Sequence, residues 1–256
     1  MDDLSEFHEM LNRIRVTHAH MEKPENEAVA YECPQCRDTG FIDCENQNGH
    51  DVVRRCDCYA MKQARKMMKL SGISTEFQKK TFENFIAGGN EQLENAKSKA
   101  MRYIDNFQTA EHYRRNSIMF SGQVGSGKTH LGTAICGELV RSGISVVYMA
   151  YRNAVTKIKQ SIMDEAAYSR ELNQYVTARV LYIDDLLKGK LSEADVNIMY
   201  EIANYRYMNN MPMIISTEKS PNDLLAFDEA TGSRIIEMCR GNIIQLQGKE
   251  LNYRLR

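Results

Sequence analysis

Apolar runs alternate with stretches of helical periodicity over most of the chain. Strands are expected at 118–120, 145–150, 180–183, 211–218 and 242–246. Apolar residues recur every three or four positions at 95–114, 130–141, 152–163 and 192–205, which predicts helices there. Strands alternating with helices favour a parallel sheet covered on both faces. The pattern therefore predicts an α/β fold, a parallel five-stranded sheet flanked by helices.

The N-terminal part of the chain follows a different pattern. An amphipathic helix is expected at 4–16, either to bind a partner or to pack on its own module, and a basic helix is expected at 59–70. Short apolar runs at 40–42 and 52–53 suit the two strands of a hairpin. We therefore predict an N-terminal helix and small module at 1–70, a linker at 71–94 and the α/β domain at 95–256.

A glycine-rich loop follows the first strand of the α/β domain. It matches the phosphate-binding pattern G-x-x-x-x-G-K-[ST] in full, with the residues Gly122-Gln123-Val124-Gly125-Ser126-Gly127-Lys128-Thr129. Such a loop needs a strand before it and a helix after it, and both are predicted here. Lys128 would reach the β- and γ-phosphates, and the Thr129 hydroxyl would ligate Mg²⁺. His130 completes the expected nucleotide-contacting segment.

Two carboxylates end the third predicted strand. Asp184 and Asp185 follow four apolar residues, and the C-terminal ends of parallel strands are where such sheets bind ligands. Asp184 would hold Mg²⁺ through water, and Asp185 would orient or deprotonate the attacking water. The polar end of the strand at 211–218 would face the γ-phosphate beside this pair.

The cysteines indicate a metal site in the N-terminal module. Five of the seven lie between Cys33 and Cys58. Cys33 with Cys36 and Cys56 with Cys58 form two pairs that can together bind one tetrahedral Zn²⁺. Cys44 and His50 lie between the pairs, and either could replace one ligand. No open-site pattern accompanies them, so we predict structural zinc that stabilises a zinc-ribbon-like module.

Charge and composition narrow the class of protein. A net charge of −1 argues against wholesale electrostatic binding to nucleic acid. Basic residues at 54–69 form a nucleic-acid face, a docking surface for an acidic partner or ordinary polar surface. Basic and aromatic residues at 152–177 are either contacts to single-stranded DNA or an ordinary amphipathic helix and loop. Apolar runs are too short to span a membrane, and the acidic N-terminus lacks signal-peptide features, so we expect a cytoplasmic protein.

Three phenylalanines in the predicted linker have two interpretations. Phe77, Phe82 and Phe85 lie just before the nucleotide-binding domain. They would either anchor the linker to that domain or flank the adenine.

Together these motifs resemble replicative helicase loaders of the DnaC/DnaI type, which belong to the AAA+ ATPases with the IstB transposition ATPases. The resemblance rests on 122–129, 181–185, 214–218 and 232–237 and covers roughly Ser71 to the C-terminus. It implies an AAA+ P-loop NTPase without a C-terminal helical lid, using ATP and Mg²⁺. The cysteine module is similar to the zinc-bearing N-terminal part of firmicute-type loaders.

The resemblance also assigns roles to single residues. Lys128 and Thr129 match the Walker A motif, and Asp184 and Asp185 match the Walker B motif. Where many AAA+ enzymes have glutamate, this chain has Asp185, which predicts slow hydrolysis.

Two further positions depart from the family pattern or are open to another interpretation. The sensor-1 position holds Thr217 or Glu218, and an acid there would repel the γ-phosphate. Arg234 matches the arginine-finger region and implies a homo-oligomer with shared sites. The alternatives are Arg240 as the finger, or Arg234 as a surface arginine.

A loader of this kind would place a replicative DNA helicase on single-stranded DNA, with the zinc module holding the helicase and ATP hydrolysis releasing it. One alternative is an IstB-like ATPase that regulates a transposase. Another is a nucleotide-gated adaptor with little turnover, which the Asp185 and Glu218 departures favour.

Overall fold

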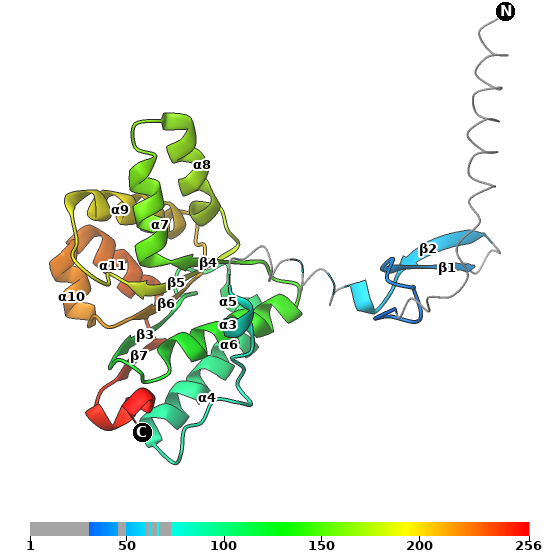
Figure 1. Cartoon of the computed structure of the whole chain (residues 1–256), viewed down its shortest axis with the longest axis horizontal. Coiled ribbons are helices and arrows are strands. Elements are labelled where there is room, and N and C mark those ends of the chain that lie inside the picture. Colours follow the sequence, from blue (N-terminus) through cyan, green and yellow to red (C-terminus); the bar gives the residue numbers. More distant parts are fainter. Residues whose placement is uncertain (1–30, 46–49, 60–61, 63–65, 67–72, 256) are drawn as a thin grey trace, which may run out of the picture. The chain divides into compact units, whose positions relative to one another are not determined.

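A computed structural model describes residues 31–45, 50–59, 62, 66 and 73–255 (Figure 1). The chain divides into two compact units between Arg54 and Arg55. The expected helix at 4–16 lies outside the described residues, and so does most of the one at 59–70. In the N-terminal part, β1 (Phe41–Glu45) and β2 (Asp51–Arg55) form a two-stranded sheet, as the apolar runs predicted.

The larger unit contains a parallel five-stranded sheet, which confirms the predicted fold class. Its strands are β3 (Ile118–Gly122), β4 (Val146–Ala150), β5 (Val180–Leu186), β6 (Met213–Thr217) and β7 (Ile243–Leu246). Their order is β4-β5-β6-β3-β7, so the first strand of this sheet in the sequence lies between the last two. The C-terminal ends of β3 and β5 therefore flank β6, which brings the glycine-rich loop and the aspartate pair to one edge.

Helices cover both faces of this sheet (Figure 1). Side chains alternate along each strand, so Phe120 enters one core and Met119 the other. The first core includes residues of α4 (Glu91–Asp105), α5 (Phe107–Ala110) and α6 (Lys128–Arg141), with α3 (Thr75–Gln78) beside it. The second lies under α7 (Tyr151–Gln160), α8 (Glu165–Val176), α9 (Glu193–Met208), α10 (Pro221–Phe227) and α11 (Glu229–Met238).

After β7 the chain forms two short 3-10 turns, η1 (Lys249–Leu251) and η2 (Tyr253–Leu255). Within the described residues, no helix combines the length and the apolar character needed to cross a bilayer.

Two helical segments differ from the predictions because capping residues set their boundaries. The helix expected at 95–114 starts at Glu91, where the Asn90 side chain accepts hydrogen bonds from the first amides, and it is divided at Asn106. The polar stretch after Met163 is the helix α8, and the Asp164 side chain caps it. Polar composition concealed α8 because only a few of its residues are buried.

The segment expected as a linker is part of the core of the larger unit. Ile73, Phe82, Phe85 and Ala87 are all buried and pack in the same cluster as α4 and α6. Phe77 packs against that cluster with part of its surface exposed. Of the two interpretations of these phenylalanines, anchoring to the nucleotide-binding domain therefore describes all three.

Candidate nucleotide-binding site

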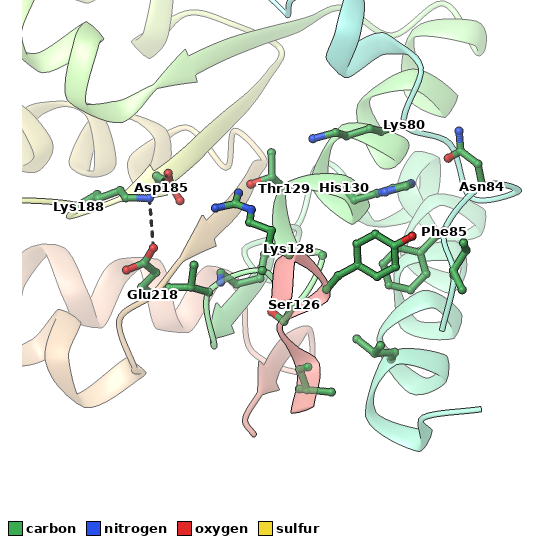
Figure 2. Close-up of a pocket in the computed structure, with 18 residues that line it drawn as sticks. Lys80, Asn84, Phe85, Ser126, Lys128, Thr129, His130, Asp185, Lys188 and Glu218 are labelled. Atoms are coloured by element: carbon green, nitrogen blue, oxygen red, sulfur yellow. Dashed lines mark hydrogen bonds and ion pairs between the residues drawn. The ribbon is translucent and has the colours of Figure 1, made fainter. Parts of the chain in front are cut away.

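A cavity of about 430 Å³ opens beside the glycine-rich loop (Figure 2). Residues Val124 to His130 line it, together with side chains from four other parts of the larger unit. These are Lys80, Asn84, Phe85 and Ile86 before α4, Leu93 in α4, Asp185, Lys188 and Glu218 in or just after β5 and β6, and Leu251, Tyr253 and Arg254 from the 3-10 turns. Most of the predicted nucleotide-contacting segment thus lies on one cavity.

The loop has the backbone conformation that a phosphate cradle needs. Gly125 and Gly127 adopt φ angles of +74° and +88°, which side chains with a Cβ rarely adopt. At Gly127 a Cβ would also lie 2.6 Å from Cε2 of Phe85. The helix α6 starts at Lys128, and the first amides of a helix have no partner within it. These amides and the helix dipole favour an anion at this point.

Lys128 lies against the loop that carries it. Its Nζ donates hydrogen bonds to the carbonyls of Gly122 at 2.9 Å and Gln123 at 2.6 Å. Burial lowers the pKa of Lys128, while the carboxylates of Glu218 and Asp185 act in the opposite direction. The ammonium is thus held by two neutral carbonyls, which a phosphate oxygen can replace.

Asp184 is the most heavily hydrogen-bonded carboxylate of the site. It is 6% exposed, and the hydroxyls of Thr129, Tyr148 and Tyr182 each donate to it at 2.9 Å. The Ser216 hydroxyl donates to it as well. Burial and the nearby Asp184 charge raise the pKa of both tyrosines, so both remain donors at neutral pH. The structure therefore brings Thr129 and Asp184 together, as the sequence predicted.

The oxygen atoms of this pair suit a magnesium ion. Mg²⁺ prefers hard oxygen ligands and is commonly held by one or two carboxylates together with phosphates. Thr129 and Asp184 would hold the ion, which would neutralise part of the phosphate charge.

A bulge in β5 sets the direction of Asp185. The pairing of β5 with β6 shifts register between Ile183 and Leu186, and Asp185 has a φ of +57°. Its amide donates to Ser216 Oγ at 3.0 Å, and its carboxylate pairs with Lys188 Nζ at 2.8 Å. Asp185 lines the cavity, whereas the more deeply buried Asp184 lies against the hydroxyls.

At the predicted sensor-1 position, Glu218 rather than Thr217 lines the cavity. The Thr217 hydroxyl is fully buried and donates to the Leu186 carbonyl at 2.8 Å. Glu218 pairs with Lys188 at 3.2 Å, which offsets the negative charge that a phosphate would meet (Figure 2). A direct catalytic role for Thr217 stays a prediction.

Arg234 is not among the residues that line the cavity of its own chain. Its Nη1 donates to the Ala230 carbonyl at 2.6 Å, and its guanidinium lies 5.5 Å and 5.6 Å from the rings of Tyr200 and Tyr207. A role as an arginine finger concerns the site of a neighbouring subunit and stays a prediction.

His130 connects the loop to the segment before α4. Its ring packs edge-on against Phe85, with 5.2 Å between centroids, and its Nε2 donates to the Thr81 carbonyl at 2.8 Å. Burial lowers its pKa, as it does for Lys80, which also lines the cavity. Phe85 thus both anchors its segment and lines the cavity, and a place beside the adenine stays a prediction.

Sequence reasoning missed several side chains of this site. Tyr182 could have been found, because it lies two positions before Asp184 and so on the same face of the strand. Tyr148 lies opposite Tyr182 in the sheet register, and Ser216 meets Asp184 from the neighbouring strand. Lys188 follows the aspartate pair closely, but a lysine after a strand has no distinctive pattern.

The N-terminal cysteines form the predicted group. The sulfur atoms of Cys33, Cys36, Cys56 and Cys58 all lie within 4.8 Å of one another. In the described part of the chain, Cys44 and His50 do not belong to this group. Four thiolates at this separation suit tetrahedral Zn²⁺, which would crosslink the two ends of the hairpin.

Comparison with known proteins identifies a matching family. Residues 50–235 match the family described as IstB-like ATP binding protein. Phage-like element PBSX protein XkdC of Bacillus subtilis (strain 168) is 36% identical over 244 residues, 91% of this chain and 90% of that protein.

Similarity extends to helicase loaders. The replicative helicase loader DnaC of Escherichia coli (strain K12) is 28% identical over 182 residues, 71% of each protein. A crystal structure of the DnaC helicase loader shares the fold with a TM-score of 0.57 at 21% identity, over 68% of this chain and 100% of that one. The resemblance seen in the motifs is thus confirmed, and the chain belongs to the IstB-like ATP-binding protein family.

Proposed function

We propose that this protein binds and hydrolyses ATP in the cavity beside the glycine-rich loop. The meeting of Thr129 and Asp184 at 2.9 Å supports this most directly, because it links the phosphate loop to the carboxylate expected to hold Mg²⁺. Lys128 would bind the β- and γ-phosphates, and Asp185 would orient the attacking water. Since aspartate is one methylene shorter than the glutamate common in AAA+ enzymes, turnover would be slow.

We further propose that ATP binding and hydrolysis drive the loading of a replicative ring helicase onto single-stranded DNA in the cytoplasm. Similarity to the protein named replicative helicase loader DnaC supports this task. The zinc module would hold the helicase, and hydrolysis would release it. Arg234 would complete the site of a neighbouring subunit, so activity would depend on assembly.

Replacing Lys128 tests the ATPase proposal. Lys128→Ala removes the cation that contacts the phosphates, and we expect ATP turnover by the full chain to fall by about 100-fold or more, which is the size of effect of one preorganised electrostatic contact. Turnover is measured as phosphate release with Mg²⁺ and single-stranded DNA, and Lys190→Ala is the control because Lys190 does not line the cavity. Equal turnover by Lys128→Ala and the unchanged protein would refute hydrolysis at this site.

The loading proposal has its own test. Capture from host lysate with ATP should recover a ring helicase, whereas a recovered transposase would favour an IstB-like regulator instead.

A nucleotide-gated adaptor is the second candidate function. The ion pairs of Lys188 with Asp185 and Glu218 favour it, because an Asp185 that stays paired cannot act on a water molecule. Single-turnover hydrolysis with DNA and the captured partner distinguishes the two. Tight ATP binding without phosphate release under those conditions would favour the adaptor.

A further inference from the structure

Lys188 links the two carboxylates at one end of the cavity. Its Nζ lies 2.8 Å from an oxygen of Asp185 and 3.2 Å from an oxygen of Glu218. All three side chains line the cavity, and in Figure 2 they lie apart from Asn84 and Phe85, with Lys128 and Thr129 between. The cluster therefore lies on the side of Lys128 away from the segment before α4.

The charges of this cluster would repel a terminal phosphate less with the lysine present than without it. Asp185 and Glu218 are both among the charges that act on Lys128, so they lie near the ammonium expected to bind the β- and γ-phosphates. With Lys188 the cluster carries one net negative charge, and without it two. A γ-phosphate entering beside two unpaired carboxylates would be repelled.

The backbone of Lys188 is held in place, while the ammonium of its side chain can exchange one ion-pair partner for another. Its amide donates to the Asp185 carbonyl at 3.1 Å, and the preceding Leu187 is buried with a φ of +59°. Arg152 holds the following turn by donating to the Lys190 carbonyl at 3.1 Å. The Lys188 side chain is 48% exposed, and ion pairs this exposed are weak enough to be exchanged for a more highly charged phosphate.

We infer that Lys188 recognises the terminal phosphate of a nucleoside triphosphate and compensates for the acid at the sensor-1 position. In the absence of nucleotide its ammonium is shared by Asp185 and Glu218. A γ-phosphate then takes this ammonium as its partner, and Asp185 is released toward the water that it orients. This inference rests on the proposed ATP-binding function and adds a determinant of selectivity for triphosphate over diphosphate.

A purely structural role would have a different consequence. If Lys188 only fastened the turn after β5 to the end of β6, its loss would lower stability and weaken the binding of every nucleotide alike. Recognition of the γ-phosphate instead predicts a change in the ratio of triphosphate to diphosphate affinity, with diphosphate binding largely kept.

The test compares affinities of the full chain for AMPPCP and ADP, both with Mg²⁺, by calorimetry. We expect Lys188→Met to weaken AMPPCP binding by about tenfold, as for the loss of one close charge in a partly solvated site, and ADP binding by less than about twofold. Lys190→Met is the matched control, since this lysine is two positions away and does not line the cavity. Thermal unfolding of each variant separates folding from binding.

A second substitution tests the compensation. Adding Glu218→Gln to Lys188→Met removes one of the two unpaired carboxylates, so AMPPCP affinity should recover by about threefold or more. If Lys188→Met left the ratio of AMPPCP to ADP affinity unchanged, the inference would be overturned, while the proposed ATP binding would stand. If the unchanged protein bound neither nucleotide, the proposed function would fail with it.

Discussion

At the scale of single residues, the conformation of the phosphate loop depends on glycines, which have no Cβ. Gly127 has a positive φ and faces the Phe85 ring, so a methyl group there meets both backbone strain and a close contact. Gly137 lies within α6, and a Cβ added there would have its nearest neighbour at 3.7 Å. The two glycines belong to the same loop and helix, but a side chain would be strained at Gly127 and would fit at Gly137.

This contrast gives a prediction for the free energy of unfolding, measured by urea denaturation. Gly127→Ala should lower it by about 1–2 kcal/mol, the cost of a left-handed conformation for a residue with a Cβ, and should weaken nucleotide binding. Gly137→Ala should raise it by about 0.5–1 kcal/mol, because alanine loses less backbone freedom in a helix. Similar effects of the two substitutions would show that the loop conformation is not constrained as described.

At the scale of elements, one buried arginine connects a helix to the loops before two strands. Arg206 of α9 is fully buried. Its guanidinium donates to the carbonyls of Tyr175 at 2.8 Å, Ala178 at 2.9 Å and Pro212 at 2.6 Å. These carbonyls lie at the end of α8 and in the loops just before β5 and β6, so one side chain satisfies backbone groups from three segments of the chain.

Arg206→Met should therefore lower the free energy of unfolding by about 3 kcal/mol or more, because several buried carbonyls would lose their donor. Arg141→Met is the control, since Arg141 makes a half-exposed ion pair with Glu138 and its loss should cost less than about 1 kcal/mol. Chemical denaturation measures both. A small effect at Arg206 would mean that water or a shift of α9 satisfies these carbonyls.

At the scale of the whole molecule, the N-terminal hairpin of β1 and β2 and the five-stranded sheet are stabilised by different means. The larger unit has two extensive apolar cores on the faces of its sheet. Among the described residues of the N-terminal hairpin, β2 is exposed along its length, and the four grouped cysteines, which lie before β1 and after β2, are the most evident source of stability. We therefore expect metal to control the folding of this hairpin with its flanking cysteines, and not that of the five-stranded sheet.

Zinc content and thermal unfolding test this expectation. The full chain should contain one zinc ion, which Cys36→Ser should lose and Cys44→Ser should keep, because only Cys36 belongs to the group of four thiols. Chelation should leave the main unfolding transition, that of the five-stranded sheet and its helices, unchanged. Loss of zinc in Cys44→Ser, or a lowered main transition after chelation, would contradict this division.

Local patterns in the sequence were sufficient for much of this description. The apolar runs identified five strands, and the glycine loop, the aspartate pair and the cysteine pairs were each identified within a few residues. Such features can be predicted because backbone conformation, phosphate binding and metal chelation depend on near neighbours. Helix boundaries were predicted less closely, since many polar residues in the sequence could cap a helix as Asn90 and Asp164 do.

Only the tertiary structure decided how these parts meet. The sheet order placed β6 between the aspartate pair and the glycine loop, and so brought Ser216 to Asp184 and Glu218 to Lys188. The tertiary structure also showed that Phe85, which the sequence assigned to a linker, packs over Gly127. Contacts between residues far apart in the chain depend on strand order and register, which no local pattern contains. The sequence by itself determined the chemistry of the loop and the aspartates, and the fold determined which side chains surround them.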